Sequence, residues 1–223
     1  MKQPQALIFD MDGTLFKTES ILDHTYHQTF QTLKEKEIFE KEVPDVARMY
    51  AGIGDVLSDI WQDLLPDVST DIHEYAADLM LEYELTAIRT GKGELYPHVK
   101  KTLATLHKNG YKLFVASNGV EKYVKGIVEY EQLGQYFTQV YSAGEFETSY
   151  KEDLVRRIFD DHNLDSAWMI GDRHSDVVAG QKNHIPIVGC AYSTFTGADE
   201  LAGADYLIHD FAEILDLLAV KNN

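Results

Sequence analysis

Short apolar runs alternate with longer segments of helical periodicity along most of the chain. Six runs of three to six residues have the character of buried strands, at residues 6–9, 111–116, 139–142, 167–170, 186–190 and 206–208. Segments with apolar residues three and four apart follow most of them, at 99–108, 121–132, 152–162 and 176–182. This alternation predicts an α/β fold in which helices cover both faces of a parallel sheet.

One stretch departs from the alternation. Between residues 18 and 90 no strand pattern occurs, and four segments are predicted to be helices, at 20–36, 43–51, 55–64 and 70–89. We therefore predict a core formed by residues 1–16 and 92–223 and an α-helical insert formed by residues 17–91. The connection around Gly91-Lys92-Gly93 is a candidate hinge, because glycine tolerates large backbone changes.

Composition and charge narrow the range of partners. The 223 residues carry a net charge of −17, so the long-range field repels nucleic acid. No apolar run reaches the ~20 residues of a membrane span, and the N-terminus lacks a signal-peptide pattern. The single cysteine, Cys190, excludes an intramolecular disulfide and favours a cytoplasmic protein. The sequence predicts no particular oligomeric state and is compatible with a monomer.

Two aspartates follow the first predicted strand, in Asp10-Met11-Asp12-Gly13-Thr14. Residues i and i+2 of an extended segment point to the same side, so Asp10 and Asp12 are expected to project together beyond the sheet. Gly13 permits a tight turn at this point. A polar turn is the simpler interpretation of the motif, whereas an EF-hand is excluded because glycine stands fourth and Ile21 twelfth.

A second acidic pair, Asp172 and Asp176, follows the strand predicted at 167–170. Favourable charge at a helix N-terminus explains Asp176 well and Asp172 less well. Parallel strands end at the same edge of a sheet, so the four carboxylates are expected to share one region and to repel each other. A hard cation with oxygen ligands offsets this repulsion, and Mg²⁺ suits a site that also holds phosphate.

Two further segments fit a phosphate site. Ser117-Asn118-Gly119 ends the second predicted strand and offers a hydroxyl, an amide and backbone N–H groups ahead of a helix. Lys151 precedes Glu152 and Asp153, where a helix begins. An ordinary capped turn and a solvent-exposed lysine are the alternative interpretations. With Mg²⁺ and Lys151 present, the net charge of the four-carboxylate cluster would change from −4 to −1.

In this order the motifs resemble those of the haloacid dehalogenase superfamily phosphatases. Glu94-Leu95-Tyr96-Pro97 and Gly134-Gln135-Tyr136-Phe137 also resemble the phosphoglycolate phosphatase-like branch, which is similar to the β-phosphoglucomutase-like one. The resemblance implies a Rossmann-like catalytic core with an inserted α-helical cap. It also implies an Mg²⁺-dependent phosphatase that hydrolyses a small phosphorylated metabolite through an aspartyl-phosphate.

The resemblance assigns roles residue by residue. Asp10 would be the nucleophile, and Asp12 would protonate the leaving oxygen and then deprotonate water. The transferring phosphoryl group would be bound by Thr14, Ser117, Asn118 and Lys151. Mg²⁺ would be held by Asp10, the backbone carbonyl of Asp12, Asp172 and, directly or through water, Asp176.

Several alternatives stay open at this point. Glu152 stands where many relatives have proline after the lysine, so Lys182 is kept as an alternative to Lys151. A β-phosphoglucomutase-like phosphomutase is the nearest competing function, although Arg173 and His174 favour hydrolysis. A non-enzymatic phospho-receiver module is more remote, because such a module needs no long insert. Phosphoglycolate, pyrophosphate, and sugar and nucleotide monophosphates all remain candidate substrates.

Overall fold

A single six-stranded sheet forms the centre of the protein in the computed structural model, which describes residues 3–194, 196–197 and 199–219. The ends of the predicted core, residues 1–2 and 220–223, lie outside the described residues. The strands are β1 (Ala6–Phe9), β2 (Lys112–Ser117), β3 (Gln139–Ser142), β4 (Ala167–Gly171), β5 (Ile187–Cys190) and β6 (Tyr206–Ile208). Their order is β3-β2-β1-β4-β5-β6, and all neighbours are parallel. The predicted α/β fold with a Rossmann-like parallel sheet is confirmed.

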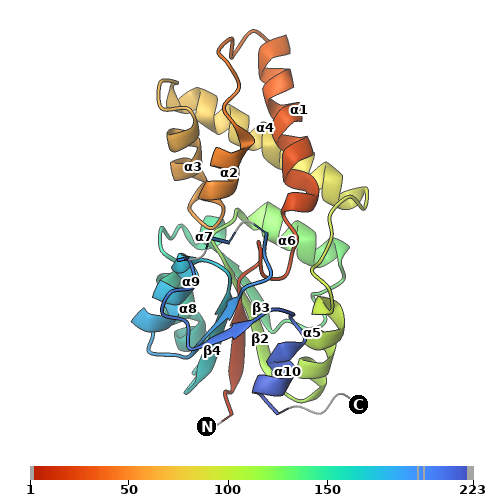
Figure 1. Ribbon diagram of the computed structural model, residues 1–223, viewed down its shortest axis with the longest axis vertical. Helices are drawn as coiled ribbons and strands as arrows, with labels where there is room; N and C mark the ends of the chain where they lie inside the picture. The colour runs from red at the N-terminus through yellow and green to blue at the C-terminus, as the bar shows by residue number, and fades with distance from the viewer. Residues whose placement is uncertain (1–2, 195, 198, 220–223) are drawn as a thin grey trace.

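Helices cover both faces of the sheet (Figure 1). Alternate residues of β1 point to opposite faces, so Leu7 and Phe9 belong to one buried apolar cluster, while Ala6 and Ile8 belong to another. The first cluster includes side chains of α5 (Val99–Lys108), α6 (Glu121–Tyr130) and α10 (Glu213–Leu217). The second includes side chains of α7 (Ala143–Phe146), α8 (Lys151–His162) and α9 (His174–Lys182). Among the described residues, no helix has the length and apolar character needed to cross a membrane.

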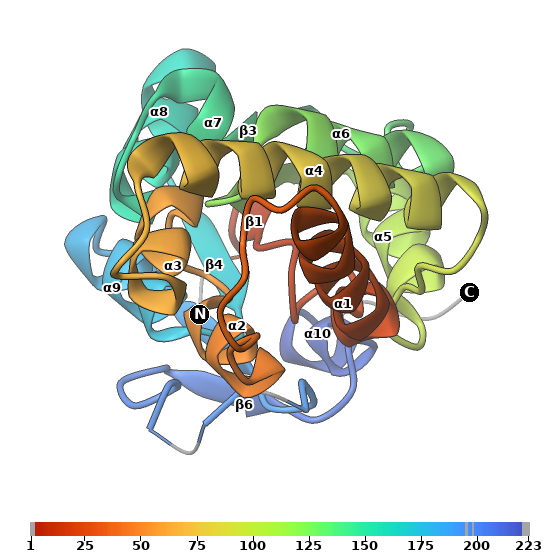
Figure 2. The ribbon, with the colours of Figure 1, turned by 90° about the horizontal axis from the view of Figure 1, so that it is seen from above.

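Of the helices between β1 and β2 in the sequence, the first four lie beyond the carboxyl ends of the strands in space (Figures 1 and 2). They are α1 (Glu19–Glu35), α2 (Val46–Gly52), α3 (Leu57–Leu64) and α4 (Thr70–Arg89). They enclose a buried apolar cluster of their own, which includes Tyr26, Phe30 and Trp61. Because α4 also packs on α6, this helical layer rests directly on the edge of the sheet where ligands of such folds bind.

The two connections between the sheet and these helices run side by side. Phe16 forms a β-bridge with Leu95, and the Lys17 backbone N–H donates to the Glu94 carbonyl at 2.8 Å. The Tyr96 backbone N–H donates to the Leu15 carbonyl at 3.0 Å. The chain therefore leaves and re-enters the sheet region at one place, which positions α1–α4 over the ends of β1 and β2.

The observed elements differ from the predicted ones mainly at short helices and helix ends. The helices α7 and α10, of four and five residues, were not predicted because they are too short to show a period. The helix predicted from 43 begins at Val46, since the Asp45 carboxylate accepts a hydrogen bond from the Ala47 backbone N–H. The helix predicted from 176 begins at His174, because the Asp176 carboxylate accepts one from the backbone N–H of Arg173.

Candidate active site

Three buried carboxylates meet at the carboxyl ends of β1 and β4. Asp10, Asp172 and Asp176 each place one oxygen within 4.8 Å of the others, and each residue is at most 2% exposed. The strands are neighbours in register, with Phe9 opposite Ile170, so the residues that follow both strands emerge together. The structure thus brings together acidic residues that are more than 160 positions apart in the sequence.

A lysine neutralises part of this cluster. Lys151 is the first residue of α8 and is 1% exposed, with its Nζ 2.8 Å from Asp10 Oδ1 and 2.6 Å from Asp176 Oδ1. Burial disfavours its charged form, but the charges of Asp10 and Asp176 outweigh that effect and hold its pKa above the usual value. Lys182, the alternative considered from the sequence, is exposed at the end of α9. The lysine in the acidic cluster is therefore Lys151.

The pKa values of two of these acids are raised, because the groups are buried and lie close to one another. Burial, with repulsion from Asp10 and Asp176, raises the pKa of Asp172 to about 8. Burial likewise raises the pKa of Asp176 to about 6, against the lowering effect of Lys151. Three carboxylates with one ammonium are short of positive charge, and their oxygens are the donors that Mg²⁺ prefers. The donor set of Asp10, Asp172 and Asp176 therefore fits a small divalent cation.

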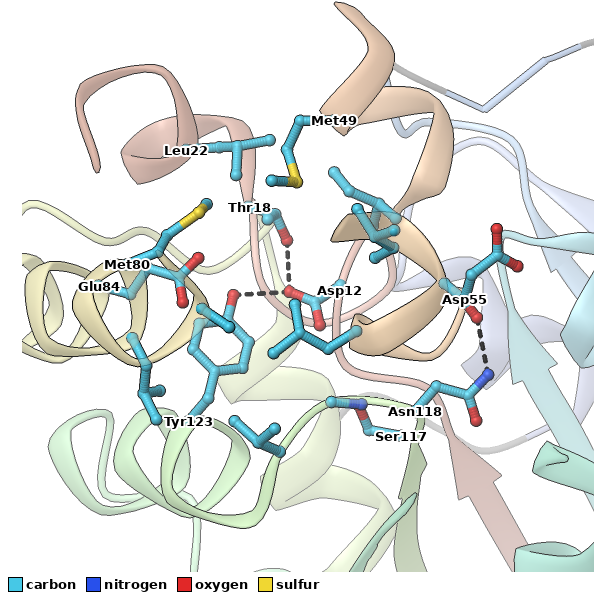
Figure 3. Close-up of a pocket in the computed structure, with 18 of the residues that line it drawn as sticks. Asp12, Thr18, Leu22, Met49, Asp55, Met80, Glu84, Ser117, Asn118 and Tyr123 are labelled. Atoms are coloured by element: carbon cyan, nitrogen blue, oxygen red, sulfur yellow. Dashed lines mark hydrogen bonds between the residues drawn. The ribbon is translucent and has the colours of Figure 1, made fainter. Parts of the chain in front are cut away.

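The side chain of Asp12 turns away from these three acids. Its Oδ1 accepts hydrogen bonds from the Thr18 hydroxyl at 2.6 Å and from the Tyr123 hydroxyl at 2.7 Å (Figure 3). Burial raises the pKa of Asp12, although both hydrogen bonds act in the opposite direction. The Asp12 carboxylate is held by these two hydroxyl groups and is not part of the cluster of three acids, so its backbone carbonyl is the remaining candidate for binding a metal. The carboxylate could instead transfer a proton.

The residues predicted to bind phosphate lie in two places. Ser117 and Asn118 line a cavity together with Asp10 and Asp12. The Ser117 hydroxyl accepts a hydrogen bond from the Gly119 backbone N–H, and Asn118 Nδ2 donates to the Gly54 carbonyl at 2.7 Å. The other two predicted residues, Thr14 and Lys151, are outside the cavity lining and lie against the acidic cluster. The Thr14 hydroxyl donates to Asp172 Oδ1 at 3.3 Å.

The cavity lies between the helical layer and the sheet and has a volume of about 100 Å³. Its floor contains Asp12, Ser117, Asn118 and Tyr123 (Figure 3), and Asp10 also belongs to the lining. Its roof comes from α1–α4 and their loops, and includes Leu22, Met49, Ile53, Leu57, Met80 and Glu84. A molecule bound there would touch both parts of the chain and reach the oxygens of Asp10 and Asp12.

Several residues near the acids were missed by sequence reasoning. Thr196 donates a hydrogen bond to Asp172 Oδ2 at 2.6 Å. Arg173 was singled out from the sequence, but its contact was not predicted: Arg173 Nη2 donates to the Tyr50 carbonyl of α2 at 2.8 Å. Thr18 and Tyr123, which donate hydrogen bonds to Asp12, were also not identified from the sequence. No spacing motif identifies such partners, because each contact joins separate elements and depends on how those elements pack.

Gly13 is packed against the acidic cluster. Its φ is +74°, and a Cβ atom there would lie 2.2 Å from Asp172 Oδ2. We expect Gly13→Ala to lower the free energy of unfolding by more than about 1 kcal/mol, because this backbone conformation is strained for alanine and the added methyl group displaces Asp172. Gly110→Ala is the matched control in denaturant unfolding, since its φ is +85° but nothing lies within 4 Å of its Cβ position. Equal losses in the two variants would contradict the packing argument.

Known proteins are similar to this one in sequence and architecture. Residues 7–190 match the family of haloacid dehalogenase-like hydrolases. A phosphoglycolate phosphatase of Vibrio cholerae is 27% identical over 99% of this chain and 100% of its own. The pyrophosphatase PpaX of Bacillus velezensis is 24% identical over 99% of both chains.

Solved structures agree over nearly the full length. A predicted phosphatase from Clostridium acetobutylicum superposes with a TM-score of 0.80 and 25% identity, covering 98% of this chain and 99% of the other. A predicted phosphoglycolate phosphatase from Haemophilus somnus reaches a TM-score of 0.83 at 21% identity, covering 97% and 99%. Since the family match spans most of the chain and the fold agrees throughout, this protein belongs to the haloacid dehalogenase-like hydrolase family.

Proposed function

We propose that this protein is an Mg²⁺-dependent phosphatase of the phosphoglycolate phosphatase-like kind. It would hydrolyse a small phosphorylated metabolite through an aspartyl-phosphate on Asp10. The observation that carries the proposal is the position of Asp10, whose carboxylate contacts Lys151 at 2.8 Å in the buried acidic cluster and also lines the cavity. The names of the relatives support phosphate chemistry as the reaction class.

The residues that would hold Mg²⁺ are Asp10, Asp172, Asp176 and the backbone carbonyl of Asp12. When bound, the ion neutralises negative charge on the phosphoryl oxygens and on the carboxylates around them. Lys151 contributes a fixed positive charge, because its Nζ contacts both Asp10 and Asp176. Ser117 and Asn118 would hydrogen-bond the phosphoryl group, and their presence with Asp10 in the cavity lining supports this role.

The reaction divides between two aspartates. An oxygen of Asp10 attacks phosphorus, and the bond from phosphorus to the leaving oxygen breaks as the new one forms. Asp12, whose raised pKa favours the protonated form, gives its proton to the leaving oxygen. In the second step Asp12 accepts a proton from the water that attacks the aspartyl-phosphate. Phosphate leaves and Asp10 is regenerated.

We further propose that residues 17–91 act as a cap over this chemistry, with the catalytic core formed by residues 1–16 and 92–223. The cavity has walls from both parts, and Thr18, at the start of the helical segment, donates a hydrogen bond to Asp12. The paired connections near Phe16 and Leu95 are the positions at which the cap would pivot. Closure would remove bulk water during the first step.

Phosphate release tests the proposal. The protein is expected to hydrolyse p-nitrophenyl phosphate over many turnovers in the presence of Mg²⁺. A phospho-receiver module would be labelled once and release no further phosphate. A phosphomutase would instead convert β-glucose 1-phosphate to glucose 6-phosphate without net phosphate release. Either of these outcomes would overturn the assignment as a phosphatase.

The role of Asp12 can be separated from that of Asp10. Asp12→Ala is expected to lower steady-state turnover by about 10²–10⁴-fold, the usual contribution of a general acid or base. Nitrophenolate needs little protonation to leave, so the first step should survive and give a burst of one nitrophenolate per enzyme. Intact-protein mass should then show one added phosphoryl group. The label should be absent in Asp10→Asn/Asp12→Ala, and a label retained there would place the nucleophile elsewhere.

A further inference from the structure

The roof of the cavity is apolar apart from the Gly54 backbone, two acidic groups, and the Thr18 hydroxyl, which donates its hydrogen bond to Asp12. Its apolar lining comes from Leu22, Met49, Ile53, Leu57, Ile60, Ala77, Met80 and Leu81. The acidic residues of the lining are Asp10 and Asp12 on the floor, with Asp55 and Glu84 contributed by the helical segment. Among the described residues that line the cavity, none is lysine, arginine or histidine. The part of a substrate that extends beyond Asp12 would therefore meet hydrocarbon and negative charge.

Glu84 is the acidic residue that α4 contributes to this cavity (Figure 3). The structure gives its carboxylate no hydrogen bond or ion pair with another described residue. Burial, followed by the charge of Asp12, raises the pKa of Glu84 to about 8. Glu84 is partly buried, and a partly buried carboxylate without a partner is unfavourable, so a ligand group that donates hydrogen bonds or carries positive charge would relieve it.

Three cationic side chains from the core and the helical segment could be considered as partners for an anionic leaving group, but each already has other partners. Lys151 pairs with Asp10 and Asp176 in the acidic cluster. Arg48 donates hydrogen bonds to the carbonyls of Asp63 and Leu64, the last two residues of α3.

Arg173 donates to the Tyr50 carbonyl and pairs with Glu200 at 3.4 Å. None of these three cations lines the cavity. Arg173 lies against Gly54 of the lining, where its charge already acts on Asp55. A carboxylate or a second phosphate on the leaving group would therefore find no cation in the lining itself, and would lie beside the carboxylates of Asp12 and Glu84.

We propose that Glu84 recognises the leaving group, and that the preferred substrate is the phosphate monoester of a short amino alcohol. This inference rests on the proposed function and names its substrate class. With the leaving oxygen at Asp12, the rest of the alcohol extends into the cavity of about 100 Å³, which has room for a few heavy atoms. The ammonium group pairs with Glu84, and the methylene groups contact Met80 and Leu22.

Three esters of matched size test the proposal, because their leaving groups all have two carbons and differ in charge. They are 2-aminoethyl phosphate, 2-hydroxyethyl phosphate and 2-phosphoglycolate. At about pH 8, kcat/KM is expected to fall in that order, by at least about tenfold from the first ester to the second and again from the second to the third. The wild-type order requires no variant and therefore stands even where a substitution affects folding.

Substitution of Glu84 identifies the recognising residue. Glu84→Gln is expected to lower the ratio of kcat/KM for 2-aminoethyl over 2-hydroxyethyl phosphate by at least about tenfold, because the carboxylate charge is removed while its shape is kept. Glu82→Gln is the matched control, since Glu82 is exposed on the same helix and is absent from the cavity lining. That variant should keep the wild-type ratio. Circular dichroism and thermal unfolding verify that both variants are folded.

Two results would overturn the inference while leaving the proposed function intact. One is hydrolysis of p-nitrophenyl phosphate that depends on Mg²⁺ and Asp10, without a preference for 2-aminoethyl phosphate over the other two esters. The other is an unchanged ratio in a folded Glu84→Gln protein. Loss of the proposed function looks different, because p-nitrophenyl phosphate itself would then not be hydrolysed.

Discussion

Asp10→Asn is expected to lower kcat for p-nitrophenyl phosphate by at least about three orders of magnitude. The substitution keeps the shape of the side chain but removes the negative charge of the proposed nucleophile, whose Oδ1 lies 2.8 Å from Lys151 Nζ. No neighbouring acid can replace it, because Asp172 and Asp176 follow β4 and the Asp12 carboxylate is held by Thr18 and Tyr123. Nitrophenolate release under saturating substrate measures the effect.

The same variant is expected to remain folded, with an unfolding temperature within a few degrees of the wild type. It removes one charge from a group of acids whose mutual repulsion raises their pKa values, and Lys151 keeps its contact with Asp176 at 2.6 Å. Asp160→Asn, at an exposed position, is the control for loss of an aspartate charge. More than a tenth of the wild-type activity in folded Asp10→Asn would show that Asp10 is not the nucleophile.

Removal of divalent metal is expected to reduce phosphatase activity to the background rate, and restored Mg²⁺ should recover it. The cluster formed by Asp10, Asp172 and Asp176 is buried and has one ammonium group for three carboxylates. Mg²⁺ should therefore also raise the unfolding temperature in calorimetry. Asp172→Asn should abolish most of that rise, because it removes one ligand. Full activity in the presence of excess chelator would refute the metal requirement.

The metal effect should depend on pH with a definite sign. In the folded protein the pKa values of Asp172 and Asp176 are about 8 and about 6, above the usual 3.8. The metal-free folded state therefore binds more protons than the unfolded state between about pH 4 and pH 8, and its stability falls as the pH rises through that range.

Mg²⁺ must displace those protons, so it should bind more tightly as the pH rises. We expect the Mg²⁺-induced rise in unfolding temperature to be larger at pH 8 than at pH 6. Calorimetry at both pH values, with and without Mg²⁺, measures this difference. An equal rise at the two pH values would contradict the assigned ligands.

Predictions that rely on local pattern agree well with the fold. Parallel strands buried on both faces are continuous apolar runs, so β1, β2 and β4 could be located from the sequence to within one residue at either end. The aspartates that follow β1 and β4 could then be placed at one edge of the sheet. The short helices α7 and α10 escaped prediction, because four or five residues do not define a period.

Local sequence pattern could not predict which lysine joins the acidic cluster, or which side chains surround Asp12. Lys151 and Lys182 both lie near helix ends in the sequence, and only the packing of α8 against α9 shows which ammonium reaches Asp10 and Asp176. The Tyr123 hydroxyl meets Asp12 across 111 positions of sequence. The spacing and periodicity of residues in the sequence do not predict such contacts.

The sequence by itself determined the layout of this protein: strands, crossover helices, and the acidic residues at the strand ends. Those features follow from hydrophobic periodicity and turn chemistry, which act over a few neighbouring residues. The tertiary structure alone decided that Glu84 faces the cavity beside Asp12, and that no cation lines that cavity among the described residues. The physical reason is that the environment of a buried charge depends on the relative placement of separately folded layers, which no local pattern encodes.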